Sequence, residues 1–306
     1  MNSSVLAYLE NSAEYFPEKC AVTDEKVSYS YSELVKLSSS VGTALSELIA
    51  SGDAVGIYME KCADAVAAFF ATVYAGGFYS VLNTELPQNR LQTTVSVLNP
   101  KVIVTSESLL ETAKEYFSER KIVTFEDLAK SEPDYAKLGE IRSHKIDTDP
   151  LYINFTSGST GTPKGAMLEH KNVRSFCDFH IRNSDIDEHS VVSAYASYGF
   201  DACLSEMYPA LIGGAELHII EEDIRLDLVR LNRYFEDNGI THAFMTTQVA
   251  RQFATEIDNH SLKYLLTGGE RLVPLEPPKN FELINGYGPT ECTVYITTQP
   301  VDKLYH

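Results

Sequence analysis

The sequence lacks the features that mark secreted, zinc-binding or membrane-spanning proteins. Its five cysteines lie far apart and include no CxxC pair, so neither a disulfide framework nor a zinc site is predicted. The longest apolar stretch, near residues 63–77, is too short and too interrupted to cross a bilayer. No basic region followed by an apolar stretch opens the chain. We therefore expect a soluble protein of the reducing cytoplasm, without a membrane partner.

Positive charge is also scarce. The 306 residues include 25 Lys and Arg against 43 Asp and Glu, which gives a formal charge of −18. Such a surface repels polyanions, so nucleic-acid binding is not expected as the main task. A hydrophobic fraction of 44% predicts a folded protein with one large domain or two medium domains.

Strand and helix patterns alternate along most of the chain, which predicts an α/β fold with parallel sheets. A polar and charged stretch at 128–149, bounded by Pro133 and Pro150, predicts a linker or surface excursion. We accordingly expect one α/β subdomain at 1–149 and a second at 150–306. The predicted strands are 27–31, 53–59, 77–82, 102–105, 191–196, 215–220, 242–245 and 264–267, and the predicted helices are 5–16, 63–74, 88–98, 202–211, 226–238 and 247–256.

A loop of small residues, FTSGSTGTPKG at 155–165, follows an apolar run. Glycines, hydroxyls and one lysine suit a loop whose backbone N–H groups hold phosphate oxygens. It is not a Walker loop, because Lys164 lies between Pro163 and Gly165. The loop therefore predicts a phosphorylated ligand of another binding type.

The stretch YINFTSGSTGTPKG at 152–165 resembles the phosphate loop of adenylate-forming enzymes, the superfamily of nonribosomal-peptide adenylation domains, acyl-CoA synthetases and luciferases. The resemblance continues through LEHKNV at 168–173, YGFDA at 198–202, LTGGE at 266–270 and NGYGPTE at 285–291. Residues 1–149 match more loosely. The resemblance implies two stacked parallel-sheet α/β subdomains of the family's large domain. The family normally continues into a β-barrel and a small C-terminal domain, so we expect this chain to be a truncated N-terminal part that lacks both.

The chemistry implied is attack by a carboxylate on the α-phosphate of ATP, with Mg²⁺ as cofactor. By resemblance, Thr156, Lys164, Thr290 and Glu291 are the catalytic residues, and Glu291 with Thr156 are the magnesium ligands. Tyr287 resembles the aromatic that stacks on adenine, and Asn285 the residue that meets the edge of the base. The nucleotide-binding residues implied are Thr156, Ser157, Gly158, Ser159, Thr160, Gly161, Lys164, Gly268, Gly269, Glu270, Asn285, Gly286, Tyr287, Gly288 and Thr290.

Asp201 indicates which carboxylate is activated. In amino-acid-activating members of the family an aspartate at this position pairs with the α-ammonium group of the substrate. An alternative interpretation makes Asp201 the N-cap of the following helix. The remaining pocket positions are apolar or small, which predicts a hydrophobic amino acid, because a charged side chain would be left unpaired. The implied substrate-binding residues are Asp201, Ala202, Ser205, Phe244, Leu266, Gly268, Gly286 and Val294.

The resemblance also implies a partner, a carrier protein whose phosphopantetheine thiol receives the aminoacyl group. Three alternatives stay open: a D-alanine–carrier ligase, an acyl-CoA synthetase relative, and a binding-competent but catalytically weak or inactive fragment. Asp201 disfavours the acyl-CoA synthetase, since a fatty acid has no positive group to pair with it.

Overall fold

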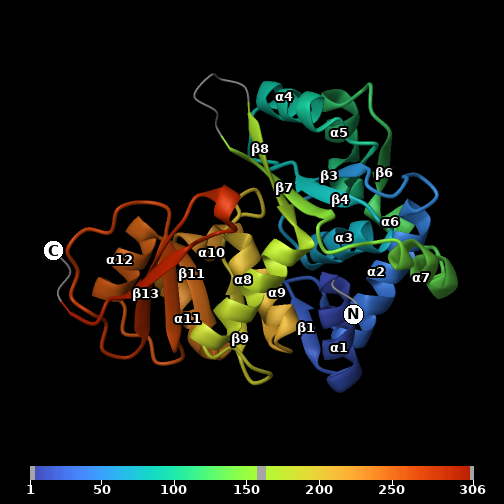
Figure 1. Ribbon diagram of the computed structural model, residues 1–306. Coiled ribbons are helices and arrows are strands. Elements are labelled where there is room, and N and C mark those ends of the chain that lie inside the picture. The colour runs from blue at the N-terminus through green and yellow to red at the C-terminus, as the bar shows by residue number, and fades with distance from the viewer. Residues whose placement is uncertain (1–3, 157–162, 304–306) are drawn as a thin grey trace. The chain divides into compact units, whose positions relative to one another are not determined.

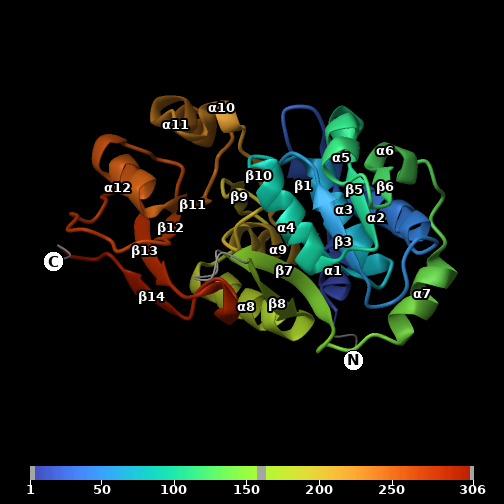
Figure 2. The same ribbon diagram turned by 90° about the horizontal axis from the view of Figure 1, so that it is seen from above.

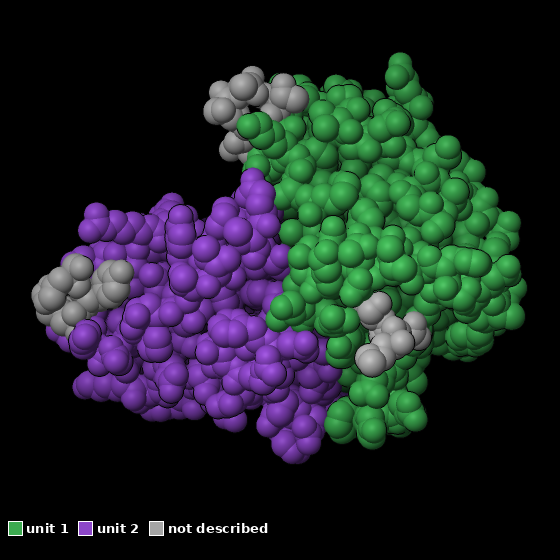
Figure 3. Space-filling model, viewed as in Figure 1, with its two compact units in different colours: residues 1–18, 29–175 green, residues 19–28, 176–306 purple. Residues whose placement is uncertain are grey.

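The protein is represented by a computed structural model, which describes residues 4–156 and 163–303. Contacts divide the chain into two compact units, shown as ribbons in Figures 1 and 2 and coloured separately in Figure 3. The first comprises residues 1–18 and 29–175, and the second residues 19–28 and 176–306. Within the described residues, no helix is long and apolar enough to cross a membrane.

The first unit is built on a six-stranded sheet in the order β6-β5-β3-β4-β7-β8. All neighbouring strands run parallel except β7 and β8, which form an antiparallel pair. The strands predicted near 53–59, 77–82 and 102–105 are confirmed. The strands are β3 (Ala54–Tyr58), β4 (Phe78–Val81), β5 (Val102–Thr105), β6 (Ile122–Thr124), β7 (Pro150–Thr156) and β8 (Lys164–Glu169).

Helices cover both faces of this sheet. Helix α3 is buried along its length, and its Phe69 stacks on Tyr79 of β4 with ring centroids 4.6 Å apart. On the other face, Leu91 and Phe117 pack against Ile103 of β5. The two faces differ because successive strand residues point to opposite sides. The helices are α1 (Val5–Tyr15), α2 (Tyr31–Leu45), α3 (Ala63–Tyr74), α4 (Gln88–Leu98), α5 (Leu110–Tyr116), α6 (Phe125–Leu128) and α7 (Tyr135–Ser143).

The segment predicted as a linker, 128–149, contains helix α7. The Asp134 side chain caps this helix by accepting from the Lys137 amide at 3.0 Å. Beyond the helix, Lys145 forms an ion pair with Asp149 at 3.1 Å. The high polarity of this segment reflects an exposed helix, which fits the predicted surface excursion, although the helix itself was not predicted.

The second unit is built on the other sheet, in the order β14-β13-β12-β11-β9-β10-β1-β2. The pairs from β13 to β1 are parallel, and β14 pairs antiparallel with β13. The strands are β1 (Cys20–Thr23), β2 (Ser28–Ser30), β9 (Val191–Ala194), β10 (Glu216–Ile219), β11 (His242–Thr246), β12 (Tyr264–Gly268), β13 (Glu282–Tyr287) and β14 (Thr297–Pro300). Only the first residue of β2, Ser28, is assigned to the second unit.

Helix α9 is the most buried helix of this unit, with every residue from Cys203 to Leu211 inaccessible to solvent. A helix buried on all sides belongs to the core, and here it carries two polar residues, Ser205 and Glu206, into it. The predicted helices at 202–211 and 247–256 are confirmed. The helices are α8 (His170–Asn183), which crosses the unit boundary, α9 (Cys203–Ile212), α10 (Glu222–Arg225), α11 (Leu228–Asp237) and α12 (Thr247–Glu256).

The predicted boundary between residues 149 and 150 separates two subdomains, whereas the two units are groups of residues defined by their contacts. The subdomain boundary therefore stays a prediction. The hairpin β7–β8, which carries the ends of the glycine-rich loop, belongs to the sheet of the first unit. The remaining motifs, from residue 198 onward, lie in the second unit.

Candidate active site

The motifs of the second unit lie at the carboxyl ends of neighbouring parallel strands. Strands β13, β12, β11 and β9 are adjacent in the sheet, and their register pairs Thr246 with Gly268 and Thr267 with Asn285. In open α/β sheets ligands bind beyond the carboxyl ends of the strands. The topology therefore gathers the motifs containing Asp201, Gly268 and Asn285, which are far apart in sequence, at one edge.

Asp201 lies at the carboxyl-end side of β9, in the turn that leads into α9. Burial raises the pKa of its carboxyl, and Glu291 raises it further, whereas hydrogen bonds from the Thr290 side chain and the Ala202 backbone act in the opposite direction. The structure therefore brings Asp201 together with Thr290 and Glu291. The N-cap of α9 is Ala202, with no side-chain cap, so the alternative interpretation of Asp201 as the N-cap was wrong.

A buried carboxylate with a raised pKa lacks a compensating cation. Within the described residues, the main influences on this pKa are burial, the Thr290 hydroxyl, two backbone amides and the Glu291 charge, so Asp201 offers a partly buried negative charge to a cationic ligand. An ammonium group fits this requirement, because it supplies both the opposite charge and hydrogen-bond donors.

The turn after β12 contains two glycines that the fold needs for different reasons. A Cβ on Gly268 would lie 2.6 Å from the Gly286 carbonyl oxygen on the neighbouring strand, and Gly269 has a φ of +99°. The first glycine permits close strand contact, and the second permits a left-handed backbone. The Thr247 hydroxyl fixes this turn by donating to the carbonyls of Gly268 at 3.1 Å and Glu270 at 3.3 Å.

At the carboxyl end of β13, two predicted nucleotide-binding side chains lack protein partners in the described part of the chain. Oδ1 of Asn285 is buried and makes no hydrogen bond there, and the Tyr287 ring is 70% exposed. Buried amide oxygens are nearly always satisfied. A ligand that donates to Asn285 and stacks on Tyr287 would satisfy both, which is what an amino-purine ring provides.

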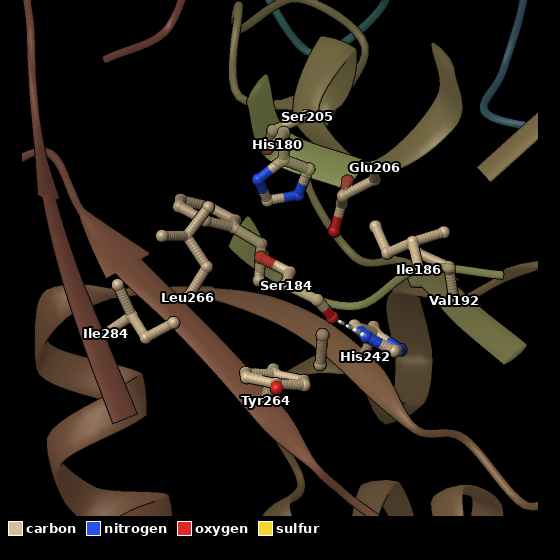
Figure 4. A pocket seen from close by; sticks show the side chains of 12 residues that line it. His180, Ser184, Ile186, Val192, Ser205, Glu206, His242, Tyr264, Leu266 and Ile284 are labelled. Atoms are coloured by element: carbon tan, nitrogen blue, oxygen red, sulfur yellow. Dashed lines mark hydrogen bonds between the residues drawn. The ribbon is translucent and has the colours of Figure 1, made fainter. Parts of the chain in front are cut away.

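A small cavity of about 20 Å³ lies below this edge, between α8, α9 and strands β11–β13 (Figure 4). Three of the predicted pocket residues line it, Ser205, Phe244 and Leu266. Its volume is that of about one water molecule. Ser205 lies four residues after Asp201, about one helical turn along the chain.

The cavity also contains polar residues that the sequence reasoning missed. His180, Ser184, Glu206 and His242 line it together with the apolar residues. Glu206 accepts hydrogen bonds from the backbone amides of Tyr195 at 2.8 Å and Ala196 at 3.0 Å. His242 Nε2 donates a hydrogen bond to the Ser184 backbone carbonyl at 2.7 Å. No sequence motif identifies these residues, because their roles depend on contacts between separate elements.

Five of the predicted pocket residues do not line this cavity. Asp201 and Ala202 lie at the start of α9, and Gly268 and Gly286 belong to adjacent strands. A Cβ on Gly286 would stand in ordinary contact with Leu266 at 3.4 Å and Tyr295 at 3.5 Å. Val294 lies in the loop between β13 and β14.

The glycine-rich loop connects β7 and β8 in the first unit. Thr156 and Lys164 face each other in the antiparallel register, and Thr156 Oγ1 donates to the Lys164 carbonyl at 3.5 Å. The side chain of Lys164 is exposed. Strand β8 was not predicted from the sequence. The predicted residues Ser157, Gly158, Ser159, Thr160 and Gly161 lie outside the described residues.

The described residues contain no group of three or more His, Cys, Asp or Glu side chains arranged for a metal ion. Mg²⁺ keeps several waters and takes few protein ligands when it binds with phosphates. The exposed carboxylate of Glu291 therefore fits such an ion, whose remaining ligands would be phosphate and water oxygens.

Comparison with known proteins agrees with this arrangement. Residues 9–306 match the family described as AMP-binding enzyme. Bacitracin synthase 1 of Bacillus licheniformis is 36% identical over 97% of this chain, which spans only 6% of that protein. The N-terminal subdomain of Klebsiella oxytoca NpsA in complex with 3-hydroxybenzoyl-AMSN matches 98% of this chain and 76% of its own, with a TM-score of 0.82 and 18% identity. The AMPPNP-bound form of the nonribosomal peptide synthetase FmoA3 matches 99% of this chain and 33% of its own, with a TM-score of 0.86 and 18% identity.

The chain belongs to the AMP-binding enzyme family. The resemblance to adenylation domains that the motifs indicated is confirmed, and so is the α/β fold of the N-terminal adenylation subdomain. The chain spans under a tenth of the length of the synthase it matches.

Proposed function

We propose that this chain activates a hydrophobic amino acid, converting the amino acid and ATP to aminoacyl-AMP and pyrophosphate. The observation that supports this most is the position of Asp201, a partly buried carboxylate with a raised pKa that contacts Thr290 and lies beside Glu291. The α-ammonium group of an amino acid is the partner that this carboxylate lacks. A substrate without that group would leave the buried charge uncompensated.

In the proposed reaction a carboxylate oxygen attacks the α-phosphorus of ATP. The new P–O bond forms as the bond to the β-phosphate oxygen breaks, and pyrophosphate leaves with the electron pair. No general base is needed, because the attacking carboxylate is already ionised at neutral pH. Catalysis then depends on positioning and on stabilising charge at the phosphate oxygens.

Each predicted residue has one role in this scheme. Asp201 holds the ammonium group, Asn285 and Tyr287 hold the base, and Thr290 lies near the α-phosphate. Thr156, Lys164 and the glycine-rich loop hold the β- and γ-phosphates. Mg²⁺, when bound at Glu291 and Thr156, would neutralise charge on the triphosphate.

The hydrophobic substrate class is supported by the residues proposed to contact the side chain. Phe244, Leu266 and Val294 are apolar, and Ser205 has its hydroxyl occupied by the Ala202 carbonyl at 2.7 Å. Among the described residues that line the cavity, the carboxylate of Glu206 already accepts hydrogen bonds from two backbone amides, and His242 is bonded to the Ser184 carbonyl. These groups are therefore less available to a charged substrate side chain. A D-alanine ligase or an acyl-CoA synthetase is less well supported, the latter because of Asp201.

Transfer of the aminoacyl group to the phosphopantetheine thiol of a carrier protein is proposed as the second step, since the relatives are peptide synthases. The alternative of a catalytically weak binding fragment is tested by the same experiment. Amino-acid-dependent exchange of pyrophosphate into ATP should occur with hydrophobic amino acids and be lost in Asp201→Ala. If calorimetry detects amino-acid binding but no exchange occurs, the binding-fragment alternative replaces the proposal.

A further inference from the structure

The loop between β13 and β14 contains two residues in an unfavourable backbone conformation. Thr293 has a φ of 63° and Val294 a φ of 69°, a left-handed region that β-branched residues rarely adopt. The Tyr295 amide donates to the Thr293 carbonyl at 2.9 Å, which closes a three-residue turn around Val294. A turn of this hand is rare and strained, so other contacts must stabilise it.

Tyr295 supplies those contacts. Its ring is buried and packs edge-on against Phe176 of α8, with centroids 5.0 Å apart and an interplanar angle of 73°. Its hydroxyl forms a hydrogen bond with Nδ1 of His180, one turn further along α8. His180 stacks on Phe176 at 5.6 Å and 11°. The phenol is therefore held by both packing and a buried polar contact.

The opposite side of the loop is also fixed. A Cβ on Gly288 would lie 2.5 Å from Cα of Tyr295 and 2.9 Å from the Ile296 amide nitrogen. The Ile296 amide donates to the Tyr287 carbonyl at 2.9 Å. The strained turn is thus enclosed between the end of β13 and the side chain of His180.

This loop carries residues of the candidate active site. Thr290, Glu291 and Val294 all precede Tyr295 within five residues, and Thr290 hydrogen-bonds to Asp201. Tyr295 Cδ1 would be 3.5 Å from a Cβ on Gly286. Releasing the tyrosine would therefore allow the turn to relax and would displace groups on both sides of the proposed substrate.

We propose that His180 is a positioning residue for amino-acid activation, which holds the strained turn at 293–295 through its hydrogen bond to Tyr295. This inference rests on the proposed function. His180 acts through the tyrosine. The His180 ring also stacks on Phe176 and lines the cavity. Replacing only one partner leaves a buried polar atom unsatisfied, whereas replacing both leaves two apolar rings in contact.

Four proteins test the proposal: wild type, His180→Phe, Tyr295→Phe and the double variant. Both substitutions keep an aromatic ring and remove one hydrogen-bonding group. Each single variant should lower kcat/KM for amino-acid-dependent exchange about tenfold, and the double variant should lose no more than a single one. Exchange is measured well below the melting temperature of each protein. Independent, multiplicative losses, or melting changes with unchanged kinetics, would overturn the proposal.

Hydrogen–deuterium exchange gives a second readout that does not depend on activity. The amides of Cys292, Thr293, Tyr295 and Ile296 are hydrogen-bonded at 2.9 to 3.1 Å. Peptides covering 290–296 should exchange about tenfold faster in either single variant, while β11 stays unchanged. Unchanged exchange at 290–296 would contradict the proposal. His189→Phe, at an exposed histidine of the same unit, is the matched control.

The two arms separate this inference from the proposed function. If the wild type shows no exchange with any amino acid, the proposed function fails, and the deuterium experiment alone still decides whether His180 holds the turn. If the wild type is active and the turn is unaffected by either substitution, only the role of His180 is wrong.

Discussion

The two units present their predicted ligand-binding residues in different ways. In the second unit, three motifs lie at the ends of the parallel strands β9, β12 and β13, and side chains of two of these motifs contact each other, namely Asp201 and Thr290. In the first unit, the glycine-rich loop closes an antiparallel hairpin, and of its predicted residues only Thr156 and Lys164 are described. The arrangement in the second unit is part of a buried sheet, whereas the described residues of the glycine-rich loop include one exposed cation, Lys164.

This difference indicates that, in the proposed reaction, the two regions have separate functions, selection of the amino acid and binding of the phosphates. Selection of the amino acid requires shape and a fixed charge, which packed strand ends supply. Binding of the terminal phosphates requires many backbone donors and little side-chain selectivity, which a loop supplies. Substitutions in the two regions should therefore change different kinetic constants.

The largest effect is expected for Asp201→Asn. Removing the charge that pairs with the ammonium group should lower kcat/KM for the amino acid about 10²- to 10³-fold, as expected for a buried charged pair. KM for ATP should change less than about twofold. Folding should be preserved or improved, because burial already disfavours the charged carboxyl and raises its pKa. Asp223→Asn, at an exposed ion pair with Arg230, is the control.

Lys164→Ala should produce the converse result. Loss of one charge-assisted contact to phosphate should lower kcat/KM for ATP about 10- to 100-fold, with little change in KM for the amino acid. Steady-state exchange kinetics with each substrate varied in turn measure both constants. Lys171→Ala, at the start of α8 where Lys171 pairs with Glu169 at 2.7 Å, should behave as the wild type. An equal effect on both substrates would remove the distinction between the two regions.

Substitutions of Gly268 and Gly286 should have different effects, the first on the stability of the fold and the second on the choice of substrate. Gly268→Ala should destabilise the protein by about 1–3 kcal/mol in urea unfolding, because the new methyl group clashes with a backbone carbonyl. Gly286→Ala places its methyl in ordinary contact and should leave stability nearly unchanged. It should instead disfavour larger substrates about tenfold relative to smaller ones. Identical behaviour of both variants would show that neither glycine borders the substrate.

The last prediction concerns pH and leaves catalysis at neutral pH aside. Burial lowers the pKa of His180 from 6.5 to about 3, so the folded state resists protonation that the unfolded chain accepts. The stabilisation that the neutral, buried imidazole gives the folded state is fully present above pH 6.5 and is lost as the pH falls toward 3. Within that window this residue alone should reduce stability by about 1.4 kcal/mol per pH unit. His180→Phe should show a shallower decline of melting temperature between pH 6 and 4, and an unchanged slope would contradict the assignment.

Much of the fold could be predicted from the sequence, because its signals are local. Helices 63–74 and 88–98 begin and end where their apolar periodicity does. Helix α7 was missed because it is exposed and has few apolar residues. Strand β8 was missed because apolar alternation is weak after the glycine-rich loop, and the strand is defined instead by its pairing with β7.

In the candidate site, too, the residues with a local sequence signal could be predicted and the others could not. Asp201, Asn285 and Thr290 were predicted because motifs identify them, and the structure brings Asp201 and Thr290 into contact. Glu206 and His180 could not be predicted, since their roles depend on bonds to the end of β9 and to Tyr295. A buried carboxylate or histidine looks like any other polar residue until its partners are known.

The most direct test compares leucine with 4-methylpentanoic acid, which differs only in lacking the α-ammonium group, in pyrophosphate exchange by the wild type and Asp201→Asn. Leucine stands for the hydrophobic class and can be replaced by whichever hydrophobic amino acid gives the fastest exchange. We expect exchange with the amino acid alone, and loss of this exchange in the variant. Equal exchange with the deaminated acid, or exchange unaffected by the substitution, would contradict the claim that Asp201 selects an amino acid.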